Sequence, residues 1–74
     1  MTVRLLSCNA HRPDRRAIAK VFEEHAGLSP GDATEQVGFL LEGSEIDLEV
    51  SDANVSSAYR AFRKHDIDYE IVGE

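Results

Sequence analysis

The chain has little cysteine, little basic charge and no long hydrophobic segment. Each of these features argues against some classes of protein. Its one cysteine cannot form an internal disulfide, which agrees with a reducing compartment. The longest uninterrupted apolar run is three residues, at Phe39-Leu40-Leu41, whereas a membrane-spanning helix needs about 20. Lys and Arg number 8 against 14 Asp and Glu, and this acidic excess argues against nucleic acid as a partner.

The composition that is present fits one small folded domain. The chain has 74 residues, of which 42% are hydrophobic and 30% are charged. These fractions are typical of a folded soluble domain, and the length allows only one. We therefore expect a single domain over residues 1–74. No basic-then-apolar leader precedes a cleavage site, so we expect a cytoplasmic protein without a membrane partner.

Alternating hydrophobicity predicts three strands, over residues 2–8, 45–50 and 67–72. In the first strand, Val3 and Leu5 share one face, and Arg4, Leu6 and Cys8 share the other. The outer face of the sheet is then expected to be mostly polar, with the side chains of Arg4, Leu6, Cys8, Asp47, Glu49, Asp68 and Glu70.

Apolar residues at helical spacing predict three helices, each with one apolar stripe. The first runs over roughly 13–26, with Pro13 at its first position. The second starts at Ser29, a natural N-cap, and is ended by Gly43. The third is capped by Ser51 and carries basic residues in its last turn.

These elements predict an α+β fold, a two-layer β-α-α-β-α-β sandwich with a three-stranded sheet and three helices on one face. The short apolar run within residues 37–42 is also compatible with a strand. A strand there would give a ferredoxin-like βαββαβ fold, and a small-ligand regulatory domain would become the better interpretation.

Positive charge is concentrated at the start of the chain. Residues 1–20 contain five basic residues and one acid, whereas residues 21–74 contain three basic and 13 acidic residues. Arg15 and Arg16 fall in the first turn of the first predicted helix, where cations oppose the helix dipole. Arg12, Arg16 and Lys20 follow a four-residue spacing and are expected to stack on that helix as a site for an acidic partner. The alternative is a solvated helix face whose cations attract the acidic remainder of the domain.

No arrangement of reactive side chains indicates catalysis or a cofactor. Cys8 and His11 have the spacing of half a zinc site, but no second close pair of ligands accompanies them. His25 lies on an apolar stripe near a helix end, with no nucleophile placed beside it, so a core-edge histidine is expected. We therefore expect a protein that is not an enzyme and holds neither metal nor cofactor.

The segment Ala26-Gly27-Leu28-Ser29-Pro30-Gly31-Asp32-Ala33 is similar to the Gly-Leu turn and helix start of a known family. Val50-Ser51 and Tyr69-Glu70-Ile71 are similar to its next helix opening and its closing strand, and Lys20 falls on a family lysine. On these residues the chain resembles the C-terminal domain of the bacterial large-subunit ribosomal stalk protein. The Clp protease adaptor shares that fold, and the start of this chain, from Leu5 to Pro13, resembles the adaptor's first strand and turn.

The resemblance implies a small non-catalytic protein–protein interaction module, and a translation-related partner is compatible with it. We expect a partner with an acidic surface to dock on the first helix and on the turn after it, at Arg12, Arg15, Arg16, Lys20, Gly27 and Leu28. The alternative is an adaptor or regulator, like the Clp adaptor, that docks through an open edge of the sheet.

Overall fold

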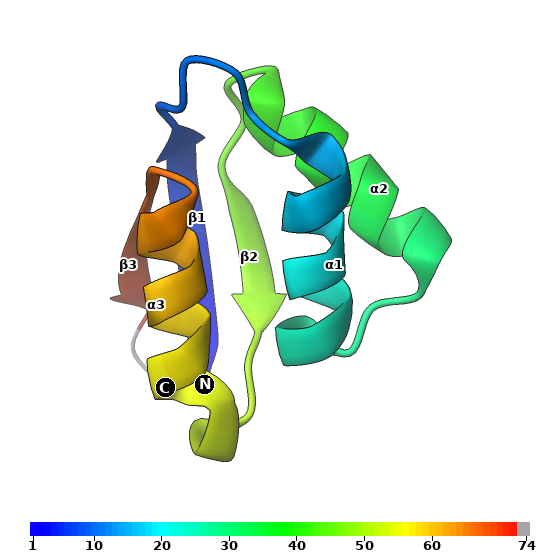
Figure 1. Cartoon of the computed structure of the whole chain (residues 1–74). Coiled ribbons are helices and arrows are strands. Elements are labelled where there is room, and N and C mark those ends of the chain that lie inside the picture. The colour runs from blue at the N-terminus through cyan, green and yellow to red at the C-terminus, as the bar shows by residue number, and fades with distance from the viewer. Residues whose placement is uncertain (73–74) are drawn as a thin grey trace.

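The predicted element order is confirmed. The computed structural model describes residues 1–72, and its elements are, in chain order, β1 (Thr2–Cys8), α1 (Arg15–Ala26), α2 (Pro30–Leu41), β2 (Ile46–Glu49), a short 3-10 turn (Asp52–Asn54), α3 (Val55–Lys64) and β3 (Ile67–Val72) (Figure 1). Residues 37–41 belong to α2, so the ferredoxin-like alternative is wrong.

The three strands form one antiparallel sheet in the order β2-β1-β3, with β1 in the centre. Val3 of β1 pairs with Leu48 on one side and with Ile71 on the other. The side chains of Val3, Leu5, Ile46 and Leu48 are buried, whereas those of Asp47, Glu49, Asp68 and Glu70 are exposed. One face of the sheet is therefore covered by the helices (Figure 1) and the other carries the charges, as the alternation predicted.

A β-bulge in β1 places one side chain on the opposite face of the sheet from the face that the sequence predicted. Leu5 pairs with Tyr69 and Ser7 pairs with Asp68, so Leu6 is an extra residue on β1. Because one extra residue reverses the alternation beyond it, Cys8 pairs with Ile67 and packs against the core. The prediction that Cys8 lies on the polar face is wrong.

On the polar face, Arg4 links the central strand to acids on both neighbouring strands. Its Nε donates to Asp47 Oδ1 at 2.9 Å, and its Nη1 lies 3.8 Å from Glu70 Oε1. The hydrogen bond from Arg4 lowers the pKa of Asp47. The one basic residue of the sheet thus lies on the central strand, between the acids of β2 and β3.

The core lies between the sheet and the helices. Phe22 of α1 and Phe62 of α3 are its largest side chains, and both are fully buried. At the start of α2, the Ser29 side chain accepts a hydrogen bond from the Asp32 amide at 3.2 Å and Pro30 is the first helical residue, as predicted. None of the helices within residues 1–72 has the length and apolar character to cross a membrane.

The start of α3 differs from the prediction. Ser51 precedes the 3-10 turn rather than α3, and its side chain makes no capping hydrogen bond. The Asn54 amide instead donates to the Ser51 carbonyl at 2.9 Å, which closes the 3-10 turn. The α-helix begins only at Val55. Backbone hydrogen bonding in a tight turn thus replaces the side-chain cap that the sequence suggested.

Candidate functional site

The first turn of α1 carries two arginines and no acid. The helix begins at Arg15, two residues after the predicted start at Pro13, because the Asp14 side chain is the N-cap and accepts a hydrogen bond from the Ala17 amide at 3.1 Å. Arg15 and Arg16 therefore occupy the first two helical positions, at the end of the helix where unpaired amide N–H groups carry a partial positive charge. Both side chains are exposed.

The other two predicted cations are placed differently. Lys20 lies one turn beyond Arg16 on α1 and is exposed. Arg12 lies in the turn before α1, so the expected helical stacking of Arg12 on Arg16 is wrong. The physical reason is the Asp14 cap, which starts the helix after Arg12. Within residues 1–72, none of these four cations forms an ion pair.

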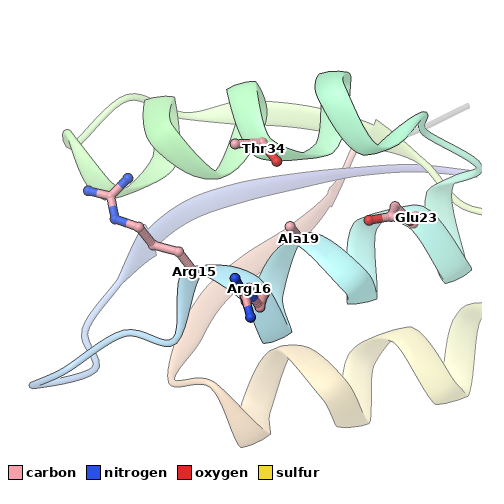
Figure 2. A pocket seen from close by; sticks show the side chains of 5 residues that line it. All are labelled: Arg15, Arg16, Ala19, Glu23 and Thr34. Carbon is pink, nitrogen blue, oxygen red and sulfur yellow. The ribbon is translucent and has the colours of Figure 1, made fainter.

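A shallow groove of about 300 Å³ runs between α1 and α2 beside the arginines. It is lined by Arg15, Arg16, Ala19, Glu23 and Thr34. Figure 2 shows Arg15 and Arg16 at the N-terminal end of α1, Glu23 further along the same helix, and Thr34 on α2 across the groove. A carboxylate that enters at the arginine end meets two cations and the start of a helix, whereas Glu23 repels it from the other end.

Sequence analysis missed the residues that α2 and the middle of α1 contribute to this groove. Thr34 lies opposite α1 only because the turn after Ala26 folds α2 back against α1. Its hydroxyl donates to the Pro30 carbonyl at 2.9 Å, so it presents mainly a methyl group and an already engaged oxygen. The short Gly27–Ser29 connection was the available signal, since a two- to five-residue loop joins antiparallel helices.

Gly27 and Leu28 were predicted to share the cationic surface, and the structure places Leu28 elsewhere. Gly27 is the left-handed C-cap of α1, with φ of 67°, which agrees with the predicted turn. Leu28 packs against the core and lines a second hollow of about 320 Å³ beside β2. The charged residues of this hollow are all acidic: Asp32, Asp47 and Glu49. Leu28 thus borders an acidic hollow, whereas the arginines border the groove between α1 and α2.

The residues considered for metal binding or catalysis do not converge. Within residues 1–72, no group of three or more His, Cys, Asp or Glu side chains is placed to hold a metal ion. The Cys8 thiol lies 3.5 Å from the backbone carbonyl of His65 rather than forming a hydrogen bond with its imidazole. His25 lies in the last turn of α1 with a buried Nδ1 that has no hydrogen-bond partner among the described residues.

In comparisons with known proteins, no protein-family model, no curated protein and no solved structure matches the chain.

Proposed function

We propose that this chain is a small non-catalytic protein-interaction module that binds an acidic segment of a partner protein on the N-terminal half of α1. The observation that carries the proposal is the pair Arg15 and Arg16, exposed in a first turn that contains no acid. Each arginine is destabilising there by about 0.3–1 kcal/mol through the helix dipole. A position that is unfavourable for folding is a candidate for use in binding.

The contrast with Arg4 supports this interpretation. Arg4 is engaged by Asp47 and Glu70 across the sheet. Arg15 and Arg16 form no ion pair within residues 1–72, although the chain contains 14 acidic residues. Direct pairing with the rest of the domain therefore does not account for them. They are available to a carboxylate from outside.

The chemistry of the groove indicates the form of the acidic segment. Two guanidinium groups at one end can each bind a carboxylate in a bidentate manner, and Lys20 extends the positive surface by one helical turn. A helix with acidic residues four apart matches this spacing. A relation to the ribosomal stalk C-terminal domain is part of the proposal and rests on the sequence features of the turn at Gly27, the Val50-Ser51 step and the last strand. A cytoplasmic location is also part of it and rests on the single cysteine, which agrees with a reducing compartment.

The test titrates the isotopically labelled protein with a helical peptide that has three glutamates at four-residue spacing, and measures the amide shifts of the protein and the affinity by NMR. We expect the shifts on α1 and on the facing part of α2. Replacing Arg15 and Arg16 with Glu is expected to weaken binding at least about tenfold, because repulsion replaces two charge-assisted contacts.

The matched control replaces Arg60 and Lys64 with Glu, which makes the same change in net charge on the exposed surface of α3. We expect the control to retain the peptide affinity within about threefold, through long-range effects only. Equal losses in the two double variants would show that the peptide responds to net charge, and shifts outside α1 and α2 would contradict the proposed site.

A further inference from the structure

The strand β3 is a free edge of the sheet. Among residues 1–72 it pairs only with β1, on one side, and its six residues make it longer than β2, the other edge strand, with four. An edge strand presents a row of unpaired amide and carbonyl groups that can accept a further strand. The backbone of β3 is therefore able to pair with an extended segment.

The side chains along β3 divide into two rows. Asp68 and Glu70 are exposed on the polar face. On the helix side, Tyr69 stacks on Tyr59 of α3, with ring centroids 4.6 Å apart, and Ile71 is 55% exposed although its neighbour Val3 in β1 is 0% exposed. The edge thus offers an acidic row and an apolar row on its opposite faces.

Arg4 engages the acids of β2 and β3 unequally. In β2, Asp47 holds two hydrogen bonds from Arg4, and Glu49 accepts one from the Thr2 hydroxyl. In β3, Asp68 accepts hydrogen bonds from the neutral side chains of Asn9 at 2.9 Å and Ser7 at 3.4 Å, and Glu70 lies 3.8 Å from the Arg4 guanidinium. Glu70 of β3 is accordingly more available to a new cation than Asp47 of β2.

The acids of β3 also disfavour pairing of β3 with the β3 strand of a second copy of the chain. Antiparallel self-pairing centred on Tyr69 sets Asp68 of one copy opposite Glu70 of the other, and pairing centred on Glu70 sets the two Glu70 side chains opposite each other. Like charges directly opposite each other in a sheet are destabilising. Charge on an edge strand is a known means of preventing such self-association.

We propose that β3 binds, by strand addition, an extended segment of a partner protein in which Lys or Arg alternates with apolar residues. Because side chains alternate between the faces of a sheet, the cations of such a segment lie beside Asp68 and Glu70 while its apolar residues lie beside Tyr69 and Ile71. This site shares no residue with the arginine groove, and its ligand has the opposite charge.

The experiment titrates the full chain with a capped peptide of alternating Lys and Val, and compares it with a peptide of the same composition in which all Lys precede all Val. We expect the alternating peptide to shift the amides of β3 and to bind at least about tenfold more tightly than the rearranged one, since only alternation separates the two rows.

Replacing Asp68 with Asn and Glu70 with Gln keeps the shapes of both side chains and removes their charges. We expect the affinity to fall about two- to thirtyfold, the range for two cross-strand charge pairs. Replacing Glu24 and Glu35 with Gln makes the same charge change on exposed helix positions and is expected to leave the affinity within about twofold. Melting curves of both variants establish that they are folded.

Equal binding of the two peptides, or equal effects of the two double variants, would overturn the proposal, because either result reports net charge alone. Shifts confined to other elements would also overturn it. Sedimentation that shows the protein alone dimerising through β3 would make a second copy the occupant. The double variant Arg15→Glu, Arg16→Glu is expected to keep its affinity for the alternating peptide, so failure of the arginine site and failure of the β3 site are distinguishable.

Discussion

Replacing Arg15 and Arg16 with Glu should stabilise the domain while it removes the proposed acidic-partner site. Both residues occupy the first turn of α1, are exposed, and form no ion pair within residues 1–72. A first-turn cation is unfavourable and a first-turn acid is favourable, each by about 0.3–1 kcal/mol. Binding and stability are then expected to change in opposite directions.

The expected gain is worked from these two positions. At the lower end of both effects, about 0.3 kcal/mol each, one replacement raises the free energy of unfolding by about 0.6 kcal/mol and the double variant gains about 1 kcal/mol. In a domain of this size that corresponds to a rise in Tm of about 4–8 °C. Replacing Lys20 with Glu tests the location of the effect, since Lys20 lies beyond the first turn, where the dipole interaction has fallen off.

Circular dichroism melts at low ionic strength and at about 1 M salt measure the change. The gain should shrink at high salt, where the Debye length is about 3 Å. A clear fall in Tm for the double variant at low salt would refute the reasoning. It would mean that the arginines stabilise the fold by long-range attraction to its acidic residues, and their unfavourable position could no longer be used as evidence for a partner.

Three further predictions concern stability. Phe22→Ala removes a fully buried ring and is expected to cost about 3–5 kcal/mol, enough to abolish a cooperative melt of this small domain. Gly27→Ala should destabilise the domain by about 1–2 kcal/mol because φ is 67°. Gly38→Ala lies inside α2, where an added Cβ meets open space, and should stabilise the domain by about 0.5–1 kcal/mol. Urea titration compares the two variants. Since Arg4 lowers the pKa of Asp47, that carboxylate stabilises the fold above about pH 4, and the effect is lost as the pH falls through the lowered pKa. Asp47→Asn should therefore reduce the fall in the free energy of unfolding at acidic pH. An unchanged fall would contradict this.

Elements whose signals lie within a few neighbouring residues could be predicted from the sequence. The strictly alternating segments became β2 and β3, and the Ser29-Pro30 pair started α2 where its capping chemistry predicts. The same cap decided the ambiguous run near Phe39, because a helix that starts at Pro30 continues through it unless a breaker intervenes. The inward and outward faces of β2 followed from alternation alone.

Features that depend on distant residues were not predictable in the same way. The bulge at Leu6 is set by the pairing of β1 with β3, and it moved Cys8 to the core. The strand order is likewise a property of pairing. Leu28 follows Gly27 directly, yet it lies beside an acidic hollow because β2 passes there. Pro13 was expected at the first helical position, but Asp14 is the N-cap and Arg12 therefore lies outside the helix.

The two proposed surfaces rest on the same argument about where stability comes from. The core of this domain is apolar, and no polar or charged residue within residues 1–72 is buried. Surface charges therefore contribute little to holding the fold together, since exposed ion pairs are worth about 0–1 kcal/mol. Arg15 and Arg16 lie where a cation is unfavourable for the helix, and in β3 a weakly compensated acid lies beside an exposed Ile71. Folding stability accounts for neither arrangement. A substitution expected to leave stability unchanged or raise it is for this reason the more informative probe of function, because a loss of binding in that variant cannot be attributed to unfolding.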